Sequence, residues 1–100
     1  MNKQELKIMK QAIEKYGVNN QMAKVQEECA ELIQAISKLN RAEDNDHPGR
    51  AAKAALNHLM EEHADVQIML DQIRIMYPSH AYDTIRAQKI ARLQKRMEKK

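Results

Sequence analysis

The stretch Glu27-Glu28-Cys29-Ala30-Glu31-Leu32 returns later in the chain as Glu61-Glu62-His63-Ala64-Asp65-Val66. Both segments read acid, acid, any residue, Ala, acid, aliphatic. At about 100° per residue in an α-helix, the acids at the second and fifth positions lie about 60° apart on one face. The aliphatic residue at the sixth position lies about 40° from the second acid, so each acidic pair borders an apolar stripe. The repeat predicts two helices that carry paired carboxylates toward each other.

Apolar residues around each segment recur at steps of four and three, which is typical of a helix packed in a bundle. The first stripe consists of Val25, Cys29, Leu32, Ile36 and Leu39, and the second of Leu56, Leu59, His63, Val66, Leu70 and Ile73. We expect the first helix to run from a cap at Asn20 to about Asn40, and the second from about Ala51 to Met76, where Tyr77-Pro78 ends it. Residues 41–50, RAEDNDHPGR, are predicted to form a solvated loop.

Two further helices complete the expected fold. Asn2 and Glu5 suit a reciprocal N-terminal cap for a helix that ends near Gly17. Ser79 is expected to cap the last helix, which runs from about His80 to the C-terminus. That helix places Ile90, Leu93 and Met97 on one face and Lys89, Arg92 and Arg96 on an adjoining face.

Composition agrees with an all-α fold. The 100 residues include 43% hydrophobic residues but only two Gly, two Pro and no Phe or Trp, and helix-forming residues dominate the rest. This length suits one domain, residues 1–100, with a core that need not be complete in one subunit. Apolar residues outside the main stripes, namely Met22, Ile33, Met60 and Ile68, predict a homo-oligomer. No apolar run is long enough to cross a bilayer and no secretory signal is visible, so we expect a cytoplasmic protein that does not enter a membrane.

The charge is unevenly distributed. Residues 86–100, the basic end of the last helix, carry seven Lys or Arg against one Glu, although the net charge of the chain is only +3. Such a segment is either a solvated face or a phosphate-binding one. Because the chain has only three aromatic residues, stacking groups for single-stranded nucleic acid are scarce, and nucleic acid is not the expected partner.

Two antiparallel helices packed by these stripes would bring four carboxylates to one place, where their repulsion requires a compensating cation. The four residues are Glu28, Glu31, Glu62 and Asp65. Ligands that are all oxygen suit Mg²⁺, with Mn²⁺ as an alternative. A di-iron site of the ferritin type would need Glu three residues before His, and neither His63 nor His58 has it.

Two cationic side chains share the carboxylate faces. Lys24 precedes Glu28 by four residues, and His58 precedes Glu62 by four. Each is either an ion-pair partner of its helix neighbour or a contact to substrate.

These motifs resemble those of the MazG-like all-α nucleoside triphosphate pyrophosphohydrolases. The acidic double motif carries the resemblance, and Lys89-Ile90-Ala91-Arg92-Leu93 is similar to the Lys-x-x-Arg segment of that family's last helix. The likeness covers most of the chain. It implies a four-helix bundle that forms homodimers or homotetramers and uses Mg²⁺ to hydrolyse a nucleoside triphosphate to the monophosphate and pyrophosphate.

The resemblance also implies roles for individual residues. The metal ligands would be Glu28, Glu31, Glu62 and Asp65. Glu27 would be the catalytic base, and Glu61 a similar but more solvated acid. Lys89 and Arg92, which carry the likeness of the last helix, would bind the phosphates. Charge and placement, and not the resemblance, make Lys24 a further candidate for phosphate binding and leave His58 as either an ion-pair partner or a substrate contact.

The sequence therefore predicts a nucleoside triphosphate pyrophosphohydrolase that acts in nucleotide-pool control. One alternative is a phosphoribosyl-ATP pyrophosphohydrolase, which shares the paired acidic motifs. The other is a helical nucleic-acid-binding or regulatory protein that uses its basic C-terminal helix, with the acids serving a structural role.

Overall fold

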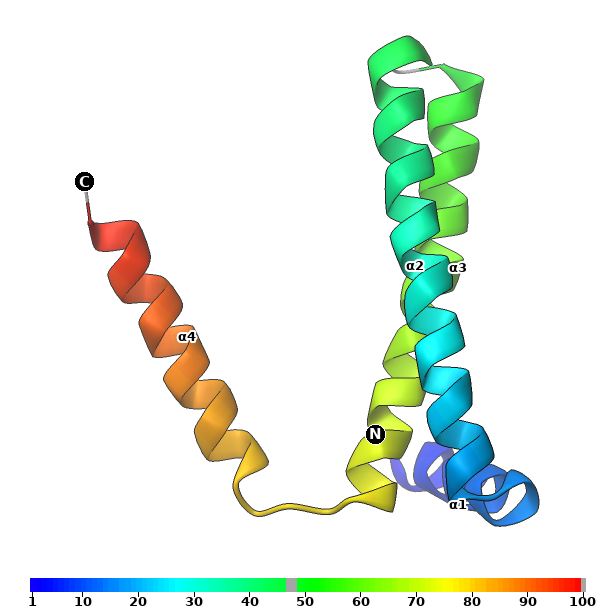
Figure 1. The fold of residues 1–100 in the computed structure, drawn as a ribbon, viewed down its shortest axis with the longest axis vertical. Helices are drawn as coiled ribbons and strands as arrows, with labels where there is room; N and C mark the ends of the chain where they lie inside the picture. The colour runs from blue at the N-terminus through cyan, green and yellow to red at the C-terminus, as the bar shows by residue number, and fades with distance from the viewer. Residues whose placement is uncertain (47–48, 100) are drawn as a thin grey trace.

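The computed structural model describes residues 1–46 and 49–99 and confirms the all-α fold (Figure 1). Its helices are α1 (Lys3–Tyr16), α2 (Val18–Asp46), α3 (Arg50–Met76) and α4 (Tyr82–Glu98). The described residues contain no strand. Within them, no helix combines the length and the apolar character that a membrane span requires.

The start of α1 is fixed by the predicted cap. The backbone N–H of Glu5 donates to Oδ1 of Asn2 at 2.8 Å, and the N–H of Asn2 donates to Oε1 of Glu5 at 2.9 Å. At the other end Gly17 adopts a φ of 90°, a conformation that side chains disfavour, and the chain turns directly into α2. Asn20 does not cap α2 as predicted. Its side-chain amide donates to the carbonyl of Tyr16 at 2.8 Å and so caps the end of α1.

The long helix α2 corrects the predicted loop at residues 41–50. The helix continues through Asp46, because Arg41, Ala42 and Glu43 are ordinary helix residues and no Gly or Pro occurs between positions 18 and 47. Asn45 donates its side-chain amide to the carbonyl of Arg41 at 2.7 Å and closes the last turns. Gly49 is the N-cap of α3, and residues 47–48 of the predicted loop lie outside the described residues.

Helices α2 and α3 pack as an antiparallel hairpin, and α1 covers the end of it where α2 begins and α3 finishes (Figure 1). Small and aliphatic residues form the centre of the hairpin. The buried members are Val25, Ala35, Ala52, Ala55, Val66 and Met69.

Both helices are rotated relative to the predicted stripes. Ile36, Leu56 and Leu70 were expected in the core, but 42%, 45% and 41% of their surfaces are exposed. Glu28 and Glu62, expected at the border of the stripes, are 7% and 9% exposed. On each helix, the face that is buried in the structure is therefore rotated by about 50–60° from the predicted apolar stripe, in the direction of the acidic residues. The acids therefore lie within the helix interface and not beside it.

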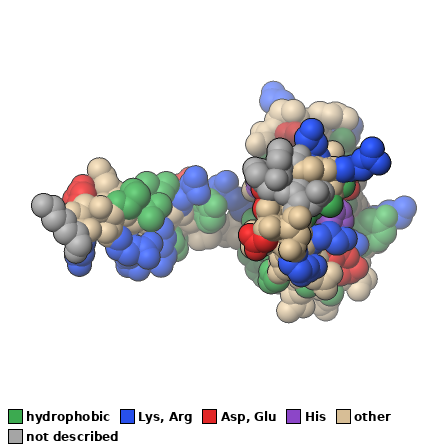
Figure 2. Space-filling view, turned by 90° about the horizontal axis from the view of Figure 1, so that it is seen from above, with side chains coloured by type: hydrophobic (Ala, Val, Ile, Leu, Met, Phe, Trp, Pro, Cys, Tyr) green, Lys and Arg blue, Asp and Glu red, His purple; other side chains and the backbone are tan. Residues whose placement is uncertain are grey.

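Helix α4 stands apart from the other three, which corrects the expected four-helix packing within one copy. Over the described residues, no helix–helix packing joins α4 to α1, α2 or α3. Figure 2 shows it projecting from the hairpin, with hydrophobic and basic side chains on different sides. The radius of gyration is consequently 17.2 Å, against about 13 Å for a compact domain of this length. The N-cap of α4 is Ala81, while Ser79 Oγ accepts the N–H of Ala81 at 3.1 Å and does not cap the helix as predicted.

A buried polar pair locks the covered end of the hairpin. Nε2 of Gln21 on α2 donates to Oε1 of Gln72 on α3 at 2.7 Å, and the two residues are 8% and 4% exposed. Because water is largely excluded there, the Gln21 amide depends on Gln72 for its hydrogen bond, while Nε2 of Gln72 donates to the sulfur of Met69 at 3.7 Å. The pair ties one position of α2 to one position of α3 and so contributes to the register in which the acidic residues of the two helices meet.

We predict that Gln72→Ala lowers the free energy of unfolding by about 1–3 kcal/mol, since it leaves the buried amide of Gln21 without its partner. Urea unfolding followed by circular dichroism measures the effect. Gln67→Ala is the matched control, because Gln67 lies on the same helix but is exposed. Equal losses in the two variants would contradict a structural role for the buried pair.

Candidate metal centre

Four acidic side chains from two helices define the candidate site. Glu28 and Glu31 lie on one face of α2, and Glu62 and Asp65 on one face of α3. One carboxylate oxygen from each of Glu28, Glu62 and Asp65 falls in a group whose members all lie within 4.8 Å of one another. The hairpin thus brings together acids that are far apart in the sequence, as the repeated motif predicts.

Two of these carboxylates are largely withdrawn from water. The side chains of Glu28 and Glu62 are 9% and 12% exposed. Oε2 of Glu28 and Oε2 of Glu62 are both buried, and neither has a hydrogen-bond partner among the described residues. A buried carboxylate oxygen without a partner is costly, and a cation is one way to offset that cost.

Glu31 belongs to the same electrostatic group although it is not among the three closest acids. The negative charge of Glu28, then partial burial, then the charge of Glu62 raise the pKa of Glu31 above its ordinary value. We name the four residues Glu28, Glu31, Glu62 and Asp65 the acidic cluster. Its deepest members are Glu28 and Glu62, while Asp65 is exposed at its rim.

One oxygen of each buried acid lies near a nitrogen-bearing side chain of its own helix, and the Lys24 ammonium is the cationic one. Nζ of Lys24 lies 3.2 Å from Oε1 of Glu28, and Nε2 of His58 lies 4.0 Å from Oε1 of Glu62. The hydrogen bond to Glu28 and the charge of Glu27 raise the pKa of Lys24. The 3.2 Å contact favours the ion-pair interpretation of Lys24, whereas His58 forms an ion pair with Glu62 only when its ring is protonated. These contacts do not involve the Oε2 atoms of the two acids, which stay buried without a hydrogen-bond partner among the described residues.

The remaining predicted site residues lie outside the cluster. The side chain of Glu27 is 59% exposed and lies 3.9 Å from Nζ of Lys24, at the margin of the site. Glu61 is 76% exposed in its side chain and faces Nδ1 of His58 at 4.0 Å. Lys89 and Arg92 are exposed on α4, and because α4 does not pack on the hairpin, one copy of the chain does not bring them to the acids.

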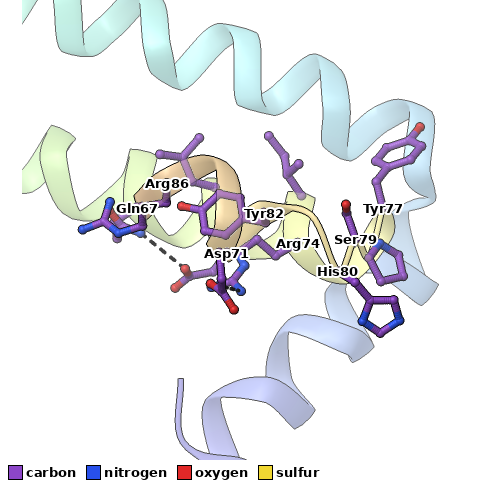
Figure 3. A pocket seen from close by; sticks show the side chains of 12 residues that line it. Gln67, Asp71, Arg74, Tyr77, Ser79, His80, Tyr82 and Arg86 are labelled. Atoms are coloured by element: carbon purple, nitrogen blue, oxygen red, sulfur yellow. Dashed lines mark hydrogen bonds and ion pairs between the residues drawn. The ribbon is translucent and has the colours of Figure 1, made fainter. Parts of the chain in front are cut away.

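A pocket of about 920 Å³ opens where the chain leaves α3 and enters α4, and none of the predicted site residues lines it (Figure 3). Asp71 and Asp83 balance Arg74 and Arg86 there. Arg74 is engaged on two sides, with Nη2 3.7 Å from Oδ1 of Asp83 and its guanidinium carbon 4.3 Å from the centre of the Tyr82 ring. The contacts of Arg74 with Tyr82 and Asp83 were not predicted from the sequence, because the partners lie on either side of the break at Tyr77-Pro78. The balanced charges make this pocket a weak site for phosphate.

The donor set fits a hard divalent cation. All four side chains offer carboxylate oxygens, which Mg²⁺ prefers, and the two unpartnered Oε2 atoms provide buried ligands from opposite helices. Zinc or copper would favour nitrogen or sulfur ligands. The nearby sulfur of Cys29 belongs to a half-buried free thiol outside the cluster.

Comparison of the chain with protein-family models, with curated proteins and with solved structures gives no match.

We predict that Glu31→Gln raises the melting temperature of the metal-free protein at neutral pH. Because the pKa of Glu31 is raised on folding, its proton stabilises the folded state at low pH, and that stability is lost as the pH rises through the folded-state pKa. Because glutamine does not ionise, the variant does not lose this stability at neutral pH, and its side chain keeps the shape of Glu31. The measurement is thermal unfolding in chelator at pH 7 and at about pH 4, where the wild-type side chain is largely protonated.

The gain should be present at pH 7 and shrink at the acidic pH. Glu14→Gln on α1 serves as the control, since Glu14 is exposed and remote from the cluster. A Glu31→Gln variant that is less stable than the wild type at pH 7 would show that the acids are held by favourable contacts and not by mutual repulsion.

Proposed function

We propose that this protein is a Mg²⁺-dependent nucleoside triphosphate pyrophosphohydrolase, acting in nucleotide-pool control in the cytoplasm. The observation that carries the proposal is the pair of buried, unpartnered oxygens, Oε2 of Glu28 and Oε2 of Glu62, with Asp65 beside them. The resemblance of the acidic double motif to the MazG-like family supplies the reaction. The absence of sequence breakers in α2 and α3 around the acids supports a rigid site of this kind.

Glu28, Glu31, Glu62 and Asp65 would hold the cation. Bound Mg²⁺ neutralises a polyphosphate, orients it and lowers the pKa of a bound water. In the proposed reaction water attacks the α-phosphorus, the bond from that phosphorus to the oxygen bridging the α- and β-phosphates breaks, and the products are the monophosphate and pyrophosphate.

The exposed residues beside the cluster suit the remaining tasks. Glu27 lies next to Glu28 in sequence and its carboxylate is solvated, so it can accept the proton that the attacking water loses. Lys24 and His58 hold the Oε1 atoms of Glu28 and Glu62, and they can turn to the phosphates when a cation takes over the compensation of the two acids.

The direct test is a panel of ribo- and deoxyribonucleoside triphosphates, together with phosphoribosyl-ATP, incubated with Mg²⁺ and resolved by product. Monophosphate plus pyrophosphate from a nucleoside triphosphate supports the proposal. Cleavage of phosphoribosyl-ATP alone would favour the histidine-biosynthetic alternative, and release of inorganic phosphate would identify a different bond. No hydrolysis of any substrate, with salt-dependent binding of DNA or RNA, would favour the nucleic-acid-binding alternative.

We predict that Asp65→Asn lowers Mg²⁺-dependent turnover by about 100-fold or more, corresponding to about 3 kcal/mol of lost transition-state stabilisation. The amide keeps the shape of the side chain but removes one negative ligand. Asp71→Asn is the matched control, because Asp71 lies on the same helix outside the cluster and accepts a hydrogen bond from Gln67. Equal activity of Asp65→Asn and wild type would exclude Asp65 from the site.

Metal binding can be measured without turnover. We predict that Mg²⁺ and Mn²⁺ raise the melting temperature of the wild type, since an ion that binds only the folded state stabilises it. Glu62→Gln should respond much less, and Asp71→Asn should respond as the wild type does. A wild type whose melting temperature is unchanged in millimolar Mg²⁺ and Mn²⁺ would mean that the acids do not form a cation site.

A further inference from the structure

The pocket between α3 and α4 has no part in the proposed hydrolysis. Its volume of about 920 Å³ lies in the range of pockets that hold small organic ligands. At about 100° per residue, Asp71 on its wall lies about 180° around α3 from Glu62. The pocket is therefore on a side of the hairpin turned away from the acidic cluster, and a ligand in it does not reach the candidate cation site.

Arg74 in the pocket is already engaged by groups of α4. Its Nη2 lies 3.7 Å from Oδ1 of Asp83, and its guanidinium carbon lies 4.3 Å from the centre of the Tyr82 ring. These contacts tie the end of α3 to the start of α4 and compensate the charges of Arg74 and Asp83. The two residues therefore form part of the frame of the pocket and are not its free binding groups.

Asp71 and Arg86 are the charged groups of the pocket that are left for a ligand. Oδ1 of Asp71 accepts a long hydrogen bond of 3.3 Å from Nε2 of Gln67, and no hydrogen bond or ion pair engages Arg86 within the described residues. Asp71 precedes Pro78 by seven residues and Arg86 follows it by eight, so each stands about 10–12 Å along its helix from the bend. Figure 3 shows both toward one side of the pocket and His80 toward the other.

Much of the remaining wall is apolar. Its apolar lining consists of Leu70, Ile73, Tyr77, Pro78 and Tyr82. Leu70, Tyr77 and Tyr82 are 41%, 56% and 41% exposed, so the pocket offers apolar surface that a ligand can cover. An aliphatic or aromatic group of a ligand suits this part of the wall.

The charges of the lining narrow the class of ligand. They come from Asp71, Arg74, Asp83 and Arg86 and sum to zero. A phosphate would add negative charge beside Asp71 and Asp83, and an apolar molecule would withdraw Asp71 and Arg86 from water without replacing their hydrogen bonds. A molecule with one ammonium and one carboxylate satisfies both free groups and keeps the pocket neutral.

We propose that this pocket binds a free α-amino acid with an aliphatic or aromatic side chain, whose ammonium donates to Asp71 and whose carboxylate accepts from Arg86. The side chain of the ligand lies against the apolar lining. Because its two charged contacts come from different helices, the bound amino acid links α3 to α4. The inference goes beyond the proposed function and does not depend on it, since the pocket and the acidic cluster share no residue.

The tyrosines report binding directly, because the chain has three of them and no Phe or Trp. Tyr77 and Tyr82 line the pocket, and Tyr16 does not. In nuclear magnetic resonance spectra of the isotope-labelled full chain, unlabelled L-phenylalanine or L-leucine should shift the ring signals of Tyr77 and Tyr82 saturably, with a smaller change at Tyr16. No shift at millimolar concentrations of either amino acid overturns the proposal, and so does a shift confined to Tyr16.

Two variants test the charged contacts. Asp71→Asn and Arg86→Gln should each weaken the binding of L-phenylalanine by about tenfold or more, since each removes a hydrogen bond to a charged group. Lys95→Gln is the matched control, because Lys95 lies on α4 about 180° around the helix from Arg86 and does not line the pocket. Neither test variant changes a core residue, so circular dichroism should show the helix content of the wild type. Unchanged affinity in both variants overturns the proposed contacts.

Analogues of the ligand assign its two ends. N-acetyl-L-phenylalanine lacks the ammonium and L-phenylalaninamide lacks the carboxylate, so each should bind the wild type about tenfold or more weakly than L-phenylalanine does. The Arg86→Gln variant should bind L-phenylalanine and L-phenylalaninamide equally, because the partner of the carboxylate is gone. An acetylated analogue that binds as tightly as L-phenylalanine, or inorganic phosphate that shifts Tyr77 and Tyr82 as strongly, overturns the assignment of an amino acid.

Discussion

The constraint on which this structure depends is the burial of Glu28 against Glu62 between two long helices. Each helix must present its acid to the other in order to use the small and aliphatic residues beside it as a core. The Lys24 ammonium compensates one oxygen of Glu28, His58 lies 4.0 Å from one oxygen of Glu62, and the other oxygen of each acid has no hydrogen-bond partner among the described residues. Packing therefore enforces an electrostatic cost that neither helix can relieve by itself, because turning the acid outward would also withdraw Val25 or Val66 from the core.

The sequence predicts much of this arrangement because the relevant signals are local. The cap at Asn2, the end of α1 near Gly17 and the end of α3 at Met76 depend on residues within one or two turns of the boundary. The spacing of the acids within each helix is likewise set by the helical repeat. Their meeting across the hairpin follows from the two similar segments packing face to face.

What the sequence could not give depends on interactions between helices. Apolar residues cover a wide part of the circumference of α3, from Leu56 and Leu70 on one side to Met69 on the other. Their spacing alone does not tell which part of this surface faces α2. The position of α1, which covers the end that holds Gln21 and Gln72, helps to select that part. The direction of α4 depends on residues 77–81 and on the contacts across them of Arg74 at the end of α3 with Tyr82 and Asp83 at the start of α4. No local sequence pattern predicts this direction.

The alanines of the hairpin bear on the choice of ion. Ala35 and Ala55 are 1% and 4% exposed, and each is separated from the buried acid of its helix by two turns, about 10 Å. Their short side chains let the two backbones approach closely, and the helices carry that separation rigidly to the level of Glu28 and Glu62. If the acidic cluster binds a cation as proposed, the separation of the two helices would limit the ionic radius that fits, since Mg²⁺ requires oxygens at about 2.1 Å and Ca²⁺ accepts about 2.3–2.6 Å. Residues that never touch the ion would in this way determine which ion the hairpin accepts.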